Sequence, residues 1–254
     1  MGKVIIGETK RAAAPKKWKY FYDMIAKMRA KKDAPVDTMG CHMLAAEGST
    51  PKEQRFHILV SLMLSSQTKD QITASAMARL HQLPLTVEKI IETDISHLSD
   101  LIYPVSFYRR KAETLRKSAM ILKEQYESDV PKTIDELTAL PGIGPKMAYL
   151  ALQNAWDLNI GIGVDVHVHR ICNRLGWVKS KTPEETRLAL QDWLPREHWR
   201  DINPLLVGFG QTMCLPMRPR CSDCLLRNGC PASTAKERGQ KMIKESFDSQ
   251  DLNM

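Results

Sequence analysis

Several features that are missing from this sequence exclude whole classes of protein. No apolar run approaches the roughly 20 residues needed to cross a bilayer, and the first residues, MGKVIIGETK, hold no long apolar segment of the kind found in signal peptides. Alternation of apolar and polar residues, which indicates a half-buried strand, is convincing at one place only. These absences predict a soluble intracellular protein with no membrane partner and with little or no β-sheet.

The one alternating stretch is itself predicted to be helical. Valines alternate with polar residues over 164–168, but the apolar spacing then continues as Val168, Ile171 and Leu175, which is the spacing of a helix face. Asp165 is a residue type favoured at helix N-caps. We therefore predict a helix that starts near Asp165.

Elsewhere the pattern is helical throughout. Apolar residues step by three and four over 112–126, as on an amphipathic helix. Thr133 with Glu136, and Thr182 with Glu185, have the spacing of capping boxes that start helices. Leu- and Ala-rich segments cut by short Pro- or Gly-bearing turns complete the pattern, and together they predict an all-α fold.

Positive charge is unevenly placed. The chain has 37 Lys and Arg against 29 Asp and Glu, a net charge of +8. Residues 1–32 hold ten Lys and Arg and only two acids, and residues 109–123 hold six Lys and Arg and one acid. Either block could be a solvated face, but together they favour a polyanionic partner, with nucleic acid as the first candidate. Residues 1–20 are predicted to be a basic flexible arm and residues 232–254 a disordered tail.

The stretch LPGIGPK, residues 140–146, predicts a helix-hairpin-helix. A capped helix precedes it and an apolar helix follows it, so the turn needs the backbone freedom of Gly142 and Gly144. Backbone N–H groups at such a turn and at the next helix N-terminus can bind an anion, and a DNA phosphate fits this site. A plain turn between two helices is the alternative.

Lys146 stands where the second helix of the hairpin begins, at the positive end of the helix dipole. It either pairs with a phosphate or acts as a neutral amine that attacks carbon. A nucleophilic lysine needs an acid or base nearby, and Asp165 is the candidate. The alternative for Asp165 is an N-cap and nothing more.

Four of the six cysteines form a cluster, Cys214-x6-Cys221-x2-Cys224-x5-Cys230. In an intracellular chain, clustered thiols more often bind metal than form disulfides. The four ligands suit either tetrahedral zinc or an iron–sulfur cluster. Between the first two lie Arg218 and Arg220, which a loop fixed at both ends would hold toward phosphates.

Three motifs in this order, LPGIGPK, then VDVHVHR at residues 164–170, then the cysteine cluster, resemble the endonuclease III family of DNA glycosylases, in its eukaryotic branch. The resemblance runs from about Phe56 to Pro231. It implies a two-lobed fold, with a six-helix barrel lobe over 48–159 that carries the hairpin at 133–155. It also implies an iron–sulfur lobe formed by 21–47 together with 160–231.

The resemblance further implies a bifunctional enzyme of base-excision repair. It would excise oxidised pyrimidines from damaged double-stranded DNA and cut the strand by β-elimination as an apurinic/apyrimidinic lyase. Lys146 would attack C1′ and form a Schiff base, Asp165 would assist base departure, and the four cysteines would hold a [4Fe-4S] cluster.

DNA-contacting residues are also implied. Gln67 would fill the space left by the flipped nucleotide, and Phe107 would be a wedge against neighbouring bases. The family often has glycine where this chain has Ser106. His167 would be a polar residue of the cleft, and Arg170 would contact a phosphate.

Three alternatives remain at this stage: a monofunctional mismatch glycosylase, an inactive DNA-binding module, and a zinc-binding regulatory protein. We expect a monomer. The basic N-terminus fits a nuclear address, a mitochondrial address, or a DNA-binding arm.

Overall fold

The computed structural model describes residues 12–235, so most of the predicted arm and tail lies outside the described residues. Within this range the chain is helical with no strand, as predicted. The α-helices are α1 (Trp18–Met28), α2 (Pro35–Met39), α3 (Pro51–Ser65), α4 (Asp70–Leu80), α5 (Val87–Glu92), α6 (Ile95–Ile102), α7 (Tyr108–Gln125), α8 (Ile134–Ala139), α9 (Pro145–Trp156), α10 (Val166–Arg174), α11 (Pro183–Trp193) and α12 (Ile202–Thr212). No helix among these is long and apolar enough to cross a bilayer.

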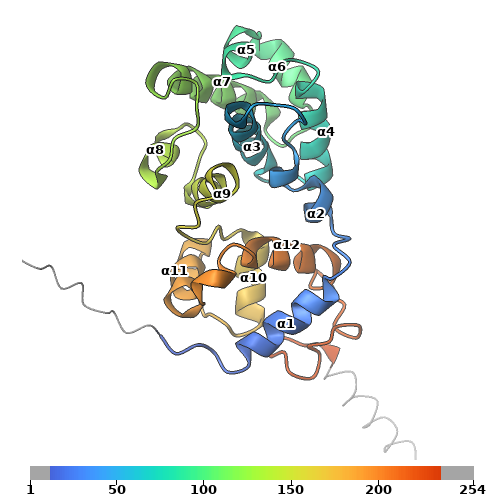
Figure 1. Ribbon diagram of the computed structural model, residues 1–254. Coiled ribbons are helices and arrows are strands. Elements are labelled where there is room, and N and C mark those ends of the chain that lie inside the picture. The colour runs from blue at the N-terminus through green and yellow to red at the C-terminus, as the bar shows by residue number, and fades with distance from the viewer. Residues whose placement is uncertain (1–11, 236–254) are drawn as a thin grey trace, which may run out of the picture.

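The buried apolar residues form two separate clusters. The first takes side chains from α3 to α9, and the second takes them from α1, the α2 region and α10 to α12. Figure 1 shows the corresponding two lobes, with α1 beside the C-terminal helices although it is far from them in the sequence. The segment after α2 belongs by its packing to the first cluster, since Cys41 and Leu44 lie against it.

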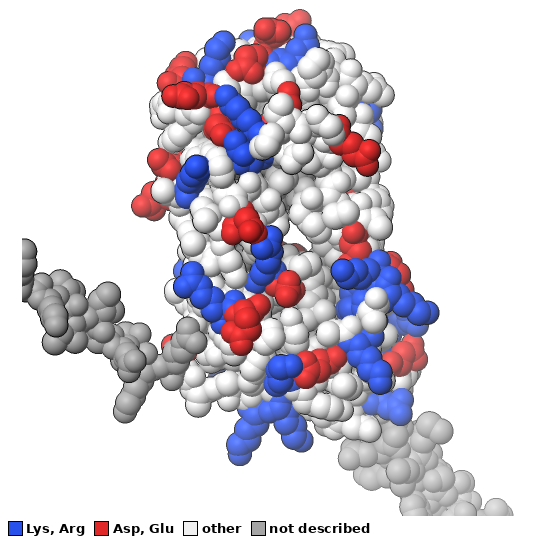
Figure 2. Space-filling model, viewed as in Figure 1, with Lys and Arg blue, Asp and Glu red and all other residues white. Residues whose placement is uncertain are grey.

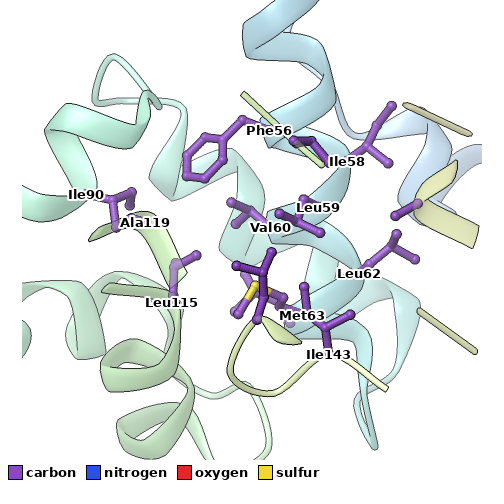
Figure 3. Packing of buried hydrophobic residues seen from close by; sticks show 14 of the residues in the cluster. Phe56, Ile58, Leu59, Val60, Leu62, Met63, Ile90, Leu115, Ala119 and Ile143 are labelled. Carbon is purple, nitrogen blue, oxygen red and sulfur yellow. The ribbon is translucent and has the colours of Figure 1, made fainter. Parts of the chain in front are cut away.

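Helix α3 is the centre of the first lobe. All nine residues from Phe56 to Leu64 are buried, so this helix has no solvent-facing side over that length. Figure 3 shows its side chains meeting Leu115 and Ala119 of α7 and Ile143 of the hairpin turn. A helix that is apolar on all sides must be enclosed by other helices, and the ends of α3 therefore have fixed positions.

Local signals start the helices where the sequence predicts them. The hydroxyl of Thr133 accepts a hydrogen bond from the backbone N of Glu136 at 3.2 Å, and Thr182 does the same for Glu185 at 3.2 Å. Helix α10 begins at Val166 with Asp165 as its N-cap. The predicted helix start near Asp165 is confirmed, and the strand alternative is wrong.

Candidate active site

The hairpin is formed as predicted by α8, a turn, and α9. Gly142 has φ of +80°, a left-handed conformation that L-residues rarely adopt, and a Cβ there would lie 2.6 Å from Cγ2 of Thr114. The turn therefore requires glycine at 142 for two independent reasons. Gly144 is different: its φ of −101° is ordinary, and a Cβ would meet no atom within 4 Å.

Lys146 is the second residue of α9, directly after the open position at Gly144 and Pro145. No neighbouring atom lies within 4 Å of where a Cβ on Gly144 would be. The first turn of α9 is therefore open to an approaching group, and its unpaired N–H groups and dipole favour an anion. Lys146 itself is half-buried, so part of its side chain packs against the protein next to this opening.

Asp165 caps α10 with one oxygen only. Its Oδ1 accepts hydrogen bonds from the backbone N of His167 at 2.9 Å and of Val168 at 2.8 Å. Among residues 12–235, no hydrogen bond to Oδ2 accompanies them. The N-cap prediction for Asp165 is therefore confirmed, and the second oxygen is left for another role.

The region between the lobes gathers further charged groups around these two residues. The Asp70 carboxyl, whose pKa burial raises, interacts electrostatically with His167 and Asp165. The Cys41 thiol, whose pKa is raised by burial, lies within range of the charges of Asp70 and Lys146. Lys146 is thus within electrostatic range of Cys41, and Cys41 and Asp165 are both within electrostatic range of Asp70. Figure 2 shows one face of the molecule with a hollow between the two lobes and with both basic and acidic side chains on the surface below it.

The two predicted insertion residues, Gln67 and Phe107, each lie in a loop at one end of a helix of the first lobe. Gln67 follows α3, and Phe107 immediately precedes α7. Both have positive φ, 54° for Gln67 and 57° for Phe107, and both side chains are exposed. Phe107 is 65% exposed, which is unusual for a phenylalanine and fits a side chain that contacts something outside the protein.

Comparison with known proteins bears directly on this arrangement. A model of HhH-GPD superfamily base excision DNA repair proteins matches residues 60–196. The Endonuclease III-like protein 1 of Bos taurus is 54% identical over 221 residues, covering 86% of this chain and 72% of that protein. The chain belongs to the endonuclease III family.

Solved structures with a similar fold agree. A non-covalent endonuclease III–DNA complex has a TM-score of 0.75 at 28% identity, over 87% of this chain and 96% of that chain. A trapped endonuclease III–DNA covalent intermediate has a TM-score of 0.74 at the same identity and coverage. As a member of this family, the chain is a DNA glycosylase with apurinic/apyrimidinic lyase activity in base-excision repair.

In this chain the four clustered cysteines line one pocket, together with the apolar side chains of Leu175, Phe209 and Leu226. Burial raises the pKa of the Cys224 thiol, and the three other thiols of the cluster raise it further because they lie near it. No three His, Cys, Asp or Glu side chains between residues 12 and 235 are grouped closely enough to hold a single metal ion. The donor set in the pocket, four sulfurs in an apolar surround, is the kind that an iron–sulfur cluster takes.

Arginines of α10 reach toward this pocket. Arg174 donates from Nη1 to the backbone O of Leu215 at 2.7 Å and from Nη2 to Pro216 O at 2.8 Å, and its Nη1 lies 3.4 Å from Sγ of Cys214. It therefore holds the loop that carries Arg218 and Arg220. No sequence signal singled out Arg174, since an arginine late in a helix is usually solvated.

The residues of this lobe that are predicted to contact DNA differ in how far their side chains are bound to the protein itself. Arg170 turns inward: its Nη2 donates to Cys214 O at 3.0 Å and lies 3.3 Å from Nδ1 of His167. Burial lowers the pKa of His167, which favours its neutral ring. Arg218 is exposed with φ of 49°, and Arg220 pairs with Asp223 at 3.1 Å. Contacts of these residues with DNA stay predictions.

One residue of the basic block at 109–123 is placed differently from a solvated face. The Nζ of Lys111 is turned inward and donates to Leu64 O at 2.7 Å and to Ser66 O at 2.6 Å. Burial first, and the charge of Lys146 second, lower the pKa of Lys111 to about 8. Reading the block as uniformly exposed is therefore wrong at this position.

Proposed function

We propose that this endonuclease III excises oxidised pyrimidines from duplex DNA with Lys146 as nucleophile and Asp165 as its acid–base partner. Two observations carry the proposal. The N-terminus of the helix that holds Lys146 is open, and the N-cap Asp165 uses only Oδ1 in its hydrogen bonds to the helix. A solved relative described as a trapped endonuclease III–DNA covalent intermediate supports a covalent step of this kind.

The chemistry follows from these groups. The neutral amine of Lys146 attacks C1′ of the flipped nucleotide, the N-glycosidic bond breaks, and the base leaves with the bonding pair and takes up a proton. The nitrogen then loses a proton and O4′ takes one up, so that the C1′–O4′ bond breaks, the sugar ring opens, and a protonated Schiff base forms between Nζ and C1′. Asp165 is placed to accept and return protons beside this centre.

Strand cleavage uses the same intermediate. The iminium makes the C2′ proton acidic, so a base removes it and the C3′–O bond breaks, with the 3′ phosphate leaving with the electron pair. Water then hydrolyses the imine and releases Lys146. The open N-terminus of α9 beside Gly144 would bind a flanking phosphate and fix the strand during these steps.

We also propose that Cys214, Cys221, Cys224 and Cys230 hold a [4Fe-4S] cluster. Such a cluster can transfer electrons, but nothing in the excision chemistry above uses a redox step. The role that the surrounding residues support is structural: the cysteines fix the two ends of the loop carrying Arg218 and Arg220. The damaged duplex would contact this loop while the protein acts as a monomer.

Borohydride trapping tests the assignment. The protein is incubated with a duplex containing one oxidised pyrimidine and reduced, beside Lys146→Gln, Asp165→Asn and Lys179→Gln, an exposed lysine as the matched control. We expect an adduct in the wild type and the control, no adduct with Lys146→Gln, and a much slower one with Asp165→Asn. An adduct that survives in Lys146→Gln would disprove the nucleophile. Base release without any adduct in the wild type would favour the monofunctional alternative.

A further inference from the structure

The loops that carry Gln67 and Phe107 are bonded directly to each other. The hydroxyl of Ser106 donates to the backbone O of Gln67 at 2.6 Å, and the backbone N of Ser106 donates to Oγ1 of Thr68 at 3.2 Å. These residues are 38 and 39 positions apart in the sequence. Ser106, the residue directly before Phe107, therefore bonds both Gln67 and the residue directly after it, Thr68.

Lys111 adds a second connection between the loops that carry Gln67 and Phe107. Its backbone N donates to Phe107 O at 2.9 Å, one helical turn along α7. Its Nζ donates to Leu64 O, Ser66 O and Thr68 Oγ1 at 2.7, 2.6 and 3.3 Å. The Lys111 side chain, from the first turn of α7, thus bonds one oxygen at the end of α3 and two oxygens of the loop that carries Gln67.

These bonds fix the backbone of both loops and leave the insertion side chains free. Gln67 and Phe107 each have a left-handed backbone, which is costly for a residue with a Cβ and persists only where the surroundings determine it. Both side chains are exposed, and the bonds above to Gln67 and Phe107 use only their backbone oxygens. One set of hydrogen bonds joins the two backbone segments that hold these conformations.

We propose that Ser106 and Lys111 are positioning residues that lock the two insertion loops into one rigid unit, so that Gln67 and Phe107 enter the duplex together. The inference rests on the proposed function of these two residues. Filling the gap left by a flipped nucleotide is favoured when the inserting groups are ordered beforehand, because no loop entropy is then lost on binding.

The side chain of Ser106 supplies a part of this contact that its backbone cannot. Ser106 is not among the residues with positive φ, so this position does not need the backbone freedom of glycine. A glycine would keep the backbone bond to Thr68 but could not make the hydroxyl bond to Gln67. The Ser106 hydroxyl therefore adds one hydrogen bond to the connection between the loops.

The test separates insertion from chemistry. Ser106→Ala and Ser106→Gly remove the hydroxyl bond, Ser106→Thr keeps a hydroxyl, and Lys111→Met removes the second connection. Single-turnover base excision is measured on a lesion duplex, and strand cleavage on a single-stranded abasic oligonucleotide, which has no gap to fill. Unstacking of a fluorescent base analogue beside the lesion reports insertion itself.

Losing one hydrogen bond should slow duplex excision and unstacking roughly 2- to 10-fold for Ser106→Ala and Ser106→Gly. Lys111→Met should slow them more, and Ser106→Thr should match the wild type. Single-stranded cleavage should stay unchanged in the Ser106 variants. In a Gln67→Ala background, Ser106→Ala should have little further effect, because the residue acts through Gln67.

Two results would overturn the proposal. Either Ser106→Ala excises and unstacks at the wild-type rate, or it loses duplex and single-stranded activity equally, which would indicate a general structural defect. Failure of the proposed function is distinguishable from both, since the wild type itself would then give no adduct and no single-stranded cleavage.

Discussion

The side-chain amide of Gln211 donates a hydrogen bond to Oδ2 of Asp70 at 2.7 Å, and so joins α12 of one lobe to α4 of the other. Its carbonyl oxygen accepts from the backbone N of Val36 at 3.0 Å. One amide thus connects three helices beside the region that holds Lys146 and Asp165. The relative position of these two residues depends on such links, because they belong to different lobes.

Replacing Gln211 by Leu should lower the free energy of unfolding by about 1–3 kcal/mol, since Asp70 loses its donor while it stays buried. Burial raises the pKa of Asp70 and Gln211 lowers it, so the variant should raise it further. With a raised pKa the folded state binds the proton more tightly, and stability falls as pH rises above the unfolded value. The loss should therefore be larger at neutral pH than in acid.

Urea unfolding of Gln211→Leu at acid and neutral pH measures this loss. Gln82→Leu, at an exposed glutamine, is the control and should change little. An equal loss at both pH values would show that Asp70 is not the group affected.

The two hairpin glycines should respond oppositely to alanine. Gly142→Ala places a Cβ 2.6 Å from Thr114 on a backbone with φ of +80°, and should destabilise the fold by about 1–3 kcal/mol. Gly144→Ala meets no atom within 4 Å and should leave stability within about 0.5 kcal/mol. It should instead weaken DNA binding, because the methyl group stands where a phosphate would approach. Thermal unfolding and a DNA titration measure both, and unchanged affinity in Gly144→Ala would place the phosphate elsewhere.

Features that depend on neighbours in the sequence could be predicted from it. The N-caps at Thr133 and Asp165 need only the next two or three residues, and Gly142 needs only its own turn. The four cysteines could be grouped because they lie within seventeen residues of one another. Lys146 and Asp165 could be proposed as the catalytic pair only through the resemblance, since Asp165 is also a complete N-cap.

Features that depend on folding could not be predicted in this way. Ser106 bonds Gln67 across 39 positions and Gln211 bonds Asp70 across 141, and no periodicity reports such pairs. Lys111 lies in a strongly basic stretch, where charge composition indicates solvent. Its burial follows from the end of α3 supplying carbonyl oxygens without helical partners, which only the packed structure brings to it.

Replacing Arg174 by lysine should perturb the protein more than the same substitution at a surface arginine. Its guanidinium bonds Leu215 O and Pro216 O at 2.7 and 2.8 Å at once, and a lysine has no fork with which to do so. Arg174→Lys should loosen the loop between Cys214 and Cys221, speed bleaching of the proposed cluster's colour in air several-fold, and weaken DNA binding. Visible absorbance over time is the measurement. Arg227→Lys, which loses one bond to Ser222 O, is the control, and equal bleaching of the two variants would contradict the assignment.

Lys111 should make stability depend on pH in the alkaline range. Its pKa is lowered from 10.5 to about 8, so between these values the folded protein has released a proton that the unfolded chain still holds. The unfolded state then binds more protons, and the free energy of unfolding rises with pH across this window. Below about pH 8 both states are protonated at Lys111 and its contribution is constant.

The difference in unfolding free energy between the wild type and Lys111→Met should therefore be flat below that pH and rise above it. Lys117→Met, at an exposed lysine of the same helix, should give no such rise. In a Lys146→Gln background the rise should begin at a higher pH, because the charge of Lys146 is the second cause of the shift. Urea unfolding at several pH values measures each difference. A flat difference for Lys111→Met would show that its amine keeps its proton in the fold, and that burial among the carbonyl oxygens of α3 does not disfavour the charge.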